Sequence, residues 1–328
     1  MQLLVLNAQA VYELLPYTEC AQLVRDGLAA LARGEVYQPL RTVLRPPGGD
    51  GLMVLMPCAG AGAYALKAIS VFPGNPARGK DAHQGGVLLY RPDTGEPLAL
   101  INASALTEIR TAAASAVATS LLARPDASEL AIIGTGVQAR AHALALAASR
   151  PLTMIRIAGR TPERARAIAN ELAALAPLAG VPVVASASAA DAVAGAGIVV
   201  TATTAAQPVL LDGWLEPGTH INAVGACLPE TRELDPATVA RAAVFADSRE
   251  SALAEAGDVG LALAEEAIGP GHIRAEIGEL LTGQAVGRTS DGEITVFESL
   301  GLAVEDLAAG LGAYQKAAAL GAGTWVDF

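Results

Sequence analysis

The segment LAIIGTGVQARAHALAL (residues 130–146) decides which fold this chain is expected to adopt. Four apolar residues lead into Gly134-x-Gly136-x-x-Ala139, and the residues that follow have helical periodicity. Gly134 allows a tight turn, Gly136 lets the backbone approach a pyrophosphate, and Ala139 replaces a third glycine while still allowing close helix packing. The glycine pattern alone also occurs in ordinary strand-to-helix turns. Its place between a predicted strand and a predicted helix favours a dinucleotide site, with phosphate bound at the helix N-terminus.

From this segment onward, short apolar strands alternate with helices. The predicted strands are LAIIG (130–134), MIRIAG (154–159), VPVVAS (181–186), GIVVTAT (197–203), HINAVG (220–225) and AVFADS (243–248). Helical periodicity covers VQARAHALALAAS (137–149) and PERARAIANELAAL (162–175), the latter with Pro162 near its first turn. This alternation predicts an α/β fold with a parallel sheet covered on both faces, a Rossmann domain over residues 116–300.

The first third of the chain has a different pattern. The segment 42–57, TVLRPPGGDGLMVLMP, predicts two strands around a turn, and 64–72, YALKAISVF, predicts another strand. The segment 85–101, GGVLLYRPDTGEPLALI, predicts a hairpin. A helix is expected over TEIRTAAASAVATSLLA (107–123) and another over the last segment, SLGLAVEDLAAGLGAYQKAAALG (299–321). We therefore expect a mostly antiparallel α+β domain over residues 1–115, to which residues 301–328 return, so that this domain is discontinuous.

Composition limits the partners. The chain of 328 residues has a net charge of -11, which disfavours nucleic acid and anionic membranes. Cys20, Cys58 and Cys227 are far apart and form no C-x-x-C, so neither a metal site nor a disulfide framework is expected. The N-terminal residues lack a basic region, and no stretch gives 18 strongly apolar residues free of charges or helix breakers. A cytoplasmic protein is the expectation.

The end of the second predicted strand indicates the cofactor. NAD-binding sheets usually place an acidic residue here to bond the ribose 2′-OH. This chain has Gly159, Arg160 and Thr161 instead. A guanidinium can pair with a 2′-phosphate and a threonine hydroxyl can donate to it, so NADPH is predicted in preference to NADH. A solvated arginine at a helix start is the simpler alternative.

Eight segments run through the chain in a recognisable order. They are QPLRTV (38–43), ALKAISVFPGN (65–75), ALTEIRTAAASAVAT (105–119), GTGVQARAH (134–142), AGRTPERA (158–165), INAVGACLPETREL (221–234), FADSRESALAEAGD (245–258) and VFESLGLAVEDLAA (296–309). Together they resemble the ornithine cyclodeaminase/mu-crystallin family. The resemblance implies a Rossmann domain joined to a substrate-binding and dimerisation domain, a homodimer, and chemistry on small α-amino or α-imino acids with a nicotinamide cofactor.

The resemblance also implies roles for individual residues. Arg41, Lys67 and Arg110 are expected around the substrate carboxylate, where two arginines and a lysine would hold an α-imino acid beside the hydride donor. Without the family context, Arg41 and Lys67 would be taken for surface cations. Lys67 is expected to have a lowered pKa because of the arginines, which suits proton donation. The cofactor contacts implied by the resemblance are Thr111, Gly134, Gly136, Val137, Gln138, Ala139, Ser299, Leu300 and Gly301. Glu298 stands where the family often has lysine.

Cys227 indicates the reaction. Cyclodeaminases of this family have an aspartate at the position that Cys227 occupies, whereas the segment GACLPETREL (225–234) resembles the pattern of mu-crystallin and the ketimine reductases. The resemblance therefore implies reduction of Δ1-pyrroline-2-carboxylate to L-proline or of Δ1-piperideine-2-carboxylate to L-pipecolate, with Cys227 as a small wall of the substrate pocket. An ornithine cyclodeaminase, an alanine or other amino-acid dehydrogenase, and a non-catalytic NADP-dependent binding protein remain alternatives.

Histidines and the cysteine thiol supply few other candidates. His83 is a second candidate proton carrier, although a loop histidine is more often exposed or structural. His142 is expected to be a packing residue. A nucleophilic Cys227 needs a base, and His220 lies at the opposite end of the predicted strand, out of hydrogen-bond reach.

Overall fold

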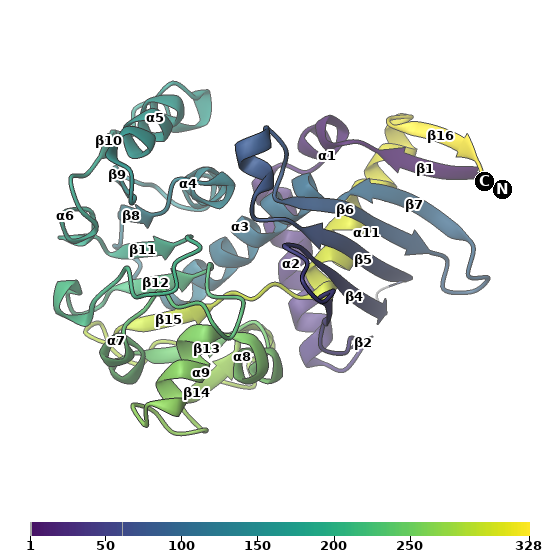
Figure 1. The fold of residues 1–328 in the computed structure, drawn as a ribbon. Helices are drawn as coiled ribbons and strands as arrows, with labels where there is room; N and C mark the ends of the chain where they lie inside the picture. Colours follow the sequence, from purple (N-terminus) through teal and green to yellow (C-terminus); the bar gives the residue numbers. More distant parts are fainter. Residues whose placement is uncertain (1, 61) are drawn as a thin grey trace. The chain divides into compact units, whose positions relative to one another are not determined.

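The computed structural model describes residues 2–60 and 62–328, which divide into two compact units (Figure 1). The first unit takes the chain as far as Thr111 and again from Leu302 to Phe328, and the second comprises Ala112–Gly301. The chain therefore leaves the first unit and returns to it at the C-terminal end. Among the described residues, no helix combines the length and apolar character that a membrane span needs.

The first unit is built on one mostly antiparallel sheet. Its strands are β1 (Gln2–Leu6), β2 (Val36–Tyr37), β3 (Thr42–Leu44), β4 (Leu52–Gly60), β5 (Ala63–Val71), β6 (His83–Tyr90), β7 (Pro97–Asn102) and β16 (Thr324–Asp327). Their order is β16-β1-β7-β6-β5-β4-β2, with β3 paired to β4, and only β1 and β7 run parallel among these pairs. The predicted strand pair and hairpin are confirmed as β3–β4 and β6–β7.

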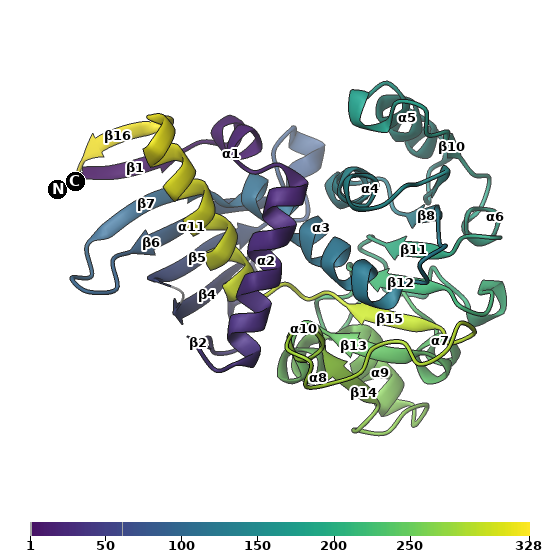
Figure 2. The ribbon, with the colours of Figure 1, turned by 180° about the vertical axis from the view of Figure 1, so that it is seen from behind.

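Helices cover one face of this sheet. The helical segments of this unit are α1 (Ala8–Leu14), α2 (Tyr17–Ala32), the first part of α3 (Ala103–Leu122) and α11 (Ala303–Leu320), together with the short 3-10 helix η1 (Asn75–Arg78) in the connection between β5 and β6. Figure 2 shows α11 and α2 side by side across the strands, and α11 packs on β4, β5 and β6. The helix α11 thus belongs to the first unit, and α2 was not among the predicted elements.

The second unit contains an all-parallel sheet in the order β10-β9-β8-β11-β12-β15-β13-β14. Its strands are β8 (Glu129–Ile133), β9 (Met154–Ala158), β10 (Val183–Ala185), β11 (Ile198–Thr201), β12 (His220–Ala223), β13 (Ala243–Ala246), β14 (Ile273–Glu276) and β15 (Thr295–Glu298). The first five have the Rossmann order 3-2-1-4-5, which confirms the predicted fold class. The point at which this order reverses lies between β8 and β11, where open α/β sheets bind ligands.

Short helices connect these strands. They are the rest of α3, α4 (Val137–Ser149), α5 (Pro162–Ala173), η2 (Ala176–Leu178), α6 (Ala189–Val193), η3 (Asp212–Trp214), α7 (Pro236–Arg241), α8 (Arg249–Glu255), α9 (Gly257–Ala264) and α10 (Ile277–Leu281). The buried core of the unit is rich in alanine and valine from strands and helices. The strands β14 and β15 were not predicted. The omission of β15 matters most, because it lies between β12 and β13 inside the sheet.

Candidate active site

The glycine-rich turn of the second unit has the geometry that dinucleotide binding requires. Gly134 has φ +146°, and a Cβ atom at this position would lie 2.4 Å from the carbonyl oxygen of Ala202. Gly136 is the N-cap of α4, and a Cβ atom there would meet nothing within 4 Å. The first glycine is thus required by the fold, whereas the second leaves open space in front of a helix N-terminus. This space fits a pyrophosphate.

The residues after Gly136 differ in exposure. Val137 is exposed, Gln138 is half-buried, and Ala139 is fully buried within the helix packing, as the third position of the fingerprint requires. His142 lies on the same helix and is fully buried, with Nδ1 2.7 Å from Gln138 O and Nε2 2.9 Å from Ser115 Oγ. Burial lowers the pKa of His142 to about 4, so this histidine is a neutral packing residue, as expected.

The end of β9 carries Gly159, Arg160 and Thr161. A Cβ atom at Gly159 would lie 2.6 Å from Cγ2 of Thr135, so glycine keeps this strand end close to the phosphate-binding turn. Arg160 is exposed and makes no ion pair with any residue that the structure describes. Thr161 is the N-cap of α5, and its side chain makes no capping hydrogen bond. A cation and a hydroxyl therefore remain available at the position where NAD-binding sheets usually carry an acid.

The segment Ser299–Gly301 is held by a buried carboxylate. Asp247 Oδ2 accepts hydrogen bonds from the backbone N–H of Leu300 at 2.8 Å and of Gly301 at 2.6 Å. Gly301 has φ +79°, a conformation that favours glycine. Ser299 is buried, and its hydroxyl has no hydrogen-bond partner within the described chain. Sequence reasoning named this segment but missed Asp247, the residue that fixes its shape.

Cys227 lies in the loop that follows β12, the fifth strand of its unit. The residue is half-buried, and its Sγ donates to the carbonyl oxygens of Val224 at 3.1 Å and Ser299 at 3.8 Å. His220, at the start of β12, is fully buried, and its Nδ1 lies 3.0 Å from Thr295 Oγ1. Burial, followed by the charge of Arg288, lowers the pKa of His220 to about 3. Through its two contacts the Cys227 thiol joins the loop after β12 to the loop after β15.

Buried charges converge in the first unit. Lys67 projects from β5 toward α11, where its Nζ lies 2.8 Å from Oδ2 of Asp306. Arg110 of α3 donates from Nε to Asp306 Oδ1 at 3.1 Å and from Nη1 to Glu305 Oε2 at 2.8 Å. The four side chains are at most 5% exposed. Asp306 therefore joins Lys67 and Arg110, whereas Glu305 pairs with Arg110 and not with Lys67.

The charges explain the direction of the pKa shifts. Burial, then the charge of Arg110, lowers the pKa of Lys67 to about 8, although Asp306 acts in the opposite direction. The lowered pKa agrees with the sequence-based expectation, but its main cause is burial and not the arginines. For Arg110, burial opposes the charged form, and Asp306 and Glu305 outweigh it and raise the pKa of the guanidinium. The helix that carries Arg110, α3, begins at Ala103, four residues before the predicted start at residue 107.

Arg41 and His83 lie within electrostatic reach of this cluster. Arg41 is half-buried, and its charge contributes to the lowered pKa of Lys67. The adjoining segment is tied to the cluster because Gln38 Oε1 accepts the backbone N–H of Val304 at 2.8 Å in the first turn of α11. Burial, then the charges of Lys67 and Arg110, lowers the pKa of His83. The structure thus brings three predicted cations together and adds a histidine beside them.

Glu305 and Asp306 were missed by the sequence analysis. Two adjacent acids at the start of an otherwise apolar helix favour a position in its first turn, where the helix dipole stabilises them. This signal predicts where the acids lie on the helix but not which cations they meet. Their partners come from β5 and α3, at separations in sequence of up to 239 residues.

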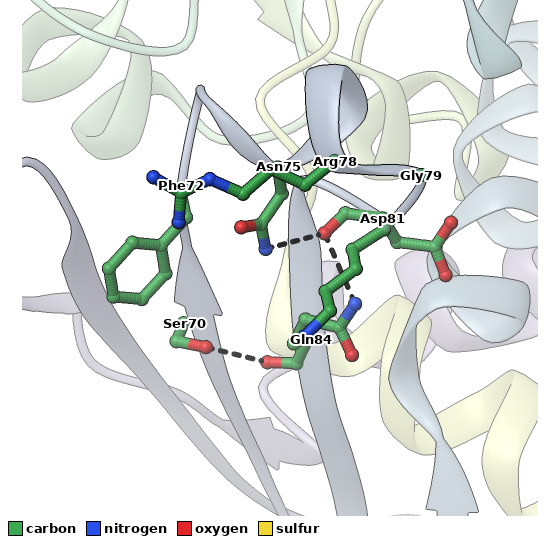
Figure 3. Close-up of a pocket in the computed structure, with 8 residues that line it drawn as sticks. Ser70, Phe72, Asn75, Arg78, Gly79, Asp81 and Gln84 are labelled. Carbon is green, nitrogen blue, oxygen red and sulfur yellow. Dashed lines mark hydrogen bonds between the residues drawn. The ribbon is translucent and has the colours of Figure 1, made fainter.

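An open hollow of about 710 Å³ lies beside β5 and β6 (Figure 3). Its lining consists of Ser70, Phe72, Asn75, Arg78, Gly79, Lys80, Asp81 and Gln84. Asn75 Nδ2 and Gln84 Nε2 both donate to the carbonyl oxygen of Asp81, which fixes the turn between β5 and β6. None of the predicted site residues lines this hollow.

Thr111 is buried on α3 and is the last residue of the first unit before the chain enters the second.

Comparison with known proteins identifies the family. Residues 1–320 match the profile of the ornithine cyclodeaminase/mu-crystallin family. A Δ1-pyrroline-2-carboxylate reductase of Bacillus cereus is 38% identical over 99% of this chain and 100% of its own length, and mouse ketimine reductase mu-crystallin is 38% identical over 84% of each chain. The structure of Thermococcus litoralis Δ1-pyrroline-2-carboxylate reductase, solved with NADH and L-proline, matches with a TM-score of 0.94 and 36% identity over 98% of this chain and 99% of the other. An archaeal alanine dehydrogenase dimer with bound NAD matches with a TM-score of 0.93 and 31% identity over 100% of both chains. The protein belongs to the ornithine cyclodeaminase/mu-crystallin family.

Proposed function

We propose that this protein is a nicotinamide-dependent reductase of small cyclic ketimines that carry an α-carboxylate. Δ1-Pyrroline-2-carboxylate, reduced to L-proline, and Δ1-piperideine-2-carboxylate, reduced to L-pipecolate, are the proposed substrates. The observation that carries this proposal is the buried Lys67–Asp306–Arg110 cluster. It occurs in a chain that has a dinucleotide-binding turn and relatives named as reductases of such imines. We assign the substrate site to the first unit and the cofactor site to the second.

The proposed substrate anchor follows from the balance of charges. The positive charges of Lys67 and Arg110 are offset by Glu305 and Asp306, so these four groups alone offer no net charge to an anion. Arg41 adds one positive charge, which is the complement of a single carboxylate. The anchor therefore favours a monocarboxylic imine, held by Arg41 together with the hydrogen atoms of Arg110 that the acids do not use.

Reduction of a C=N bond needs a hydride at C2 and a proton on nitrogen. The bound nicotinamide supplies the hydride. Lys67 is the group placed to hold the proton, because a pKa of about 8 leaves its ammonium form populated near neutrality and makes the proton easy to give. The oxygens of Asp306 keep this ammonium in one place. Cys227 needs no covalent role in this scheme.

The second unit fits a dinucleotide, and we propose NADPH in preference to NADH. The support is the exposed guanidinium of Arg160 beside Thr161 at the end of β9, in place of an acid. The ratio of kcat/KM for NADPH and NADH in the protein and in Arg160→Gln tests this assignment. An unchanged ratio in the variant would show that Arg160 is only a solvated arginine.

We further propose a homodimer formed through the open face of the first unit's sheet. Met53, Tyr64 and Leu100 alternate along their strands with buried residues and are 44%, 50% and 37% exposed. They lie on the face opposite α11, and an exposed apolar sheet face of this kind is typical of an interface. Light scattering should give the mass of two chains, and the double variant Tyr64→Glu, Leu100→Glu should give the mass of one.

One set of assays separates this function from its alternatives. The purified protein is incubated with NADPH and each cyclic imine, and with NADPH, pyruvate and ammonia, while the absorbance of the reduced cofactor is followed. L-Ornithine with NAD⁺ is tested in parallel for ammonia release. Fast oxidation of NADPH by the cyclic imines alone supports the proposal. Ammonia release from ornithine would identify a cyclodeaminase, preference for pyruvate an alanine dehydrogenase, and NADPH binding without turnover a binding protein.

A further inference from the structure

Three buried carboxylates hold together the loops at the carboxyl edge of the second unit's sheet. Glu233 accepts the backbone N–H of Thr203 and of Gly225, each at 2.6 Å, and so joins the loop after β11 to the loop after β12. Asp258, at the start of α9, accepts the N–H of Glu233 at 2.8 Å and of Leu234 at 2.9 Å through Oδ1. Asp247 holds the loop after β15 in the same way, as described above. Each of these contacts is a hydrogen bond to a charged acceptor, the strong kind.

Glu298 adds a fourth carboxyl group to this region. It is the last residue of β15, lies in register with Ala223 of β12 and Ala246 of β13, and is 1% exposed. Its Oε1 has no hydrogen-bond partner within the described chain, and neither has Oδ2 of Asp258. An ionised carboxylate that is buried near other carboxylates and lacks a partner raises the free energy of the folded state.

The surroundings favour the neutral form of Glu298. Burial, then the charges of Asp258, Glu233 and Asp247, raises its pKa well above the ordinary value. Burial also raises the pKa of Asp258 to about 7 and raises that of Glu233. The charge of Arg232 lowers the pKa of Asp258 and so opposes this shift. Nη1 of Arg232 is, however, already paired with Glu265 at 2.8 Å.

Among the described residues, the charges that act on Glu298 are those of carboxylates and not of cations. Arg249 of α8 pairs with Glu276 and Glu279, which leaves its charge balanced. Within residues 2–60 and 62–328, no three acidic, histidine or cysteine side chains converge as metal ligands. A proton on Glu298 therefore removes the charge that burial and the neighbouring carboxylates make costly.

We propose that Glu298 carries a proton at neutral pH, and that its neutral form keeps the Ser299–Gly301 loop, which follows it directly in the chain, in place beside its neighbours. Loss of the proton would put four negative charges at the junction of the loops that Glu233, Asp247 and Asp258 clamp. Glu298 is thus a positioning residue that acts through the loop beside it. Only the assignment of this loop to the nicotinamide rests on the proposed function.

The sign of the pH dependence follows from linkage. A carboxyl group whose pKa is raised on folding binds its proton more tightly in the folded state, so its stabilising effect is fully present at low pH and is lost as pH rises toward the folded pKa. For Glu298 the folding equilibrium constant should fall by up to about tenfold for each pH unit above neutrality while the proton is retained. Lys67, whose pKa is lowered to about 8, has the opposite effect above that pH, so the comparison must be made between variants.

Two measurements without substrate test the proposal. Infrared spectra of the protein at pH 7.5, about half a unit above the pKa of Asp258, should contain the carbonyl stretch of a buried protonated carboxyl group, and Glu298→Gln should lack it. Urea unfolding between about pH 7 and 8.5 should show a fall in stability with pH that Glu298→Gln removes. Glu250→Gln, which changes an exposed carboxylate in the same unit, should behave as the unchanged protein.

The outcomes are distinct from those of the functional assays. A missing carbonyl band in the unchanged protein, or the same slope of stability against pH in Glu298→Gln, would overturn the proposed proton on Glu298. If Glu298→Gln does not fold, Asp258→Asn replaces it, since removal of the other carboxylate should also flatten the slope. Affinity for NADPH should fall at alkaline pH in the unchanged protein and less so in Glu298→Gln. A protein that binds no nicotinamide at any pH refutes the proposed function, while the infrared and unfolding data still decide the proton.

Discussion

Asp306→Asn is the most informative perturbation of the candidate active site. The carboxylate bridges Lys67 Nζ at 2.8 Å and Arg110 Nε at 3.1 Å, and both of its partners are buried. Asparagine keeps the shape but removes the charge that both cations face. Removal of one partner from a buried ion pair typically costs about 3–5 kcal/mol. Because Glu305 still holds Arg110, we expect a loss of unfolding free energy near the lower end, about 3 kcal/mol.

The same change should alter the titration of Lys67. Burial and the charges of Arg110 and Arg41 lower its pKa, and Asp306 is what limits the shift, so the variant's pKa should fall further below about 8. The loss of an adjacent opposite charge is worth about 1–3 pH units. If the ammonium form of Lys67 donates the proton, the alkaline limb of kcat/KM for imine reduction should move toward acid by that amount. Activity at pH 7.5 should fall with it.

Glu305→Gln is the matched control. Its carboxylate contacts Arg110 and is not an ion-pair partner of Lys67, so the variant should lose stability but keep the alkaline limb in place. Urea unfolding at pH 6.5 measures the stability of both variants, and the pH profile of kcat/KM measures the limb. Equal pH profiles for Asp306→Asn and Glu305→Gln would refute the assignment of that limb to Lys67.

Two further changes test the second unit. Gly134→Ala places a methyl group 2.4 Å from Ala202 O at φ +146° and should cost about 1–3 kcal/mol of unfolding free energy. Gly136→Ala points its methyl group into open space, so it should leave stability unchanged but weaken NADPH binding. Equal stability of the two variants in urea unfolding would contradict this interpretation. Cys227→Ser should retain nearly all imine reduction, because a serine hydroxyl can also donate to the carbonyl oxygens that the thiol contacts, and a loss of several orders of magnitude in kcat would instead reveal a nucleophile.

The parts of the fold that the sequence predicted are those encoded locally. The turn at Gly134, the helix that begins after Gly136, and the hairpin around residues 91–96 follow from glycine, proline and apolar periodicity within a few residues. The strand β15 contains β-branched residues too, but it follows a long irregular segment and joins the sheet between β12 and β13. Its place depends on neighbours more than 45 residues away, which no local pattern specifies.

The candidate site shows the same limit in its charges. Arg41, Lys67 and Arg110 were predicted through the family resemblance, which identifies residue types at positions but not the groups that surround them. Taken alone, three cations would suit a dianion as well as a monoanion. Glu305 and Asp306 reach the cluster only because α11 returns to pack on β5, and they cancel two of the three positive charges.

That cancellation gives the proposed substrate preference a physical basis. With one net positive charge left among the five groups, a second carboxylate on the substrate would enter a region already occupied by Glu305 and Asp306. Once the first carboxylate is bound, no net positive charge remains among the five groups to offset the loss of hydration of a second one. The iminosuccinate reductase of Paracoccus denitrificans has the same fold at 28% identity, so the fold itself does not decide this preference. Competition assays with a mono- and a dicarboxylic imine should therefore favour the monocarboxylate in the unchanged protein, and Glu305→Gln should narrow the difference. A variant that discriminates as sharply as the unchanged protein would place the origin of the preference outside the charge cluster.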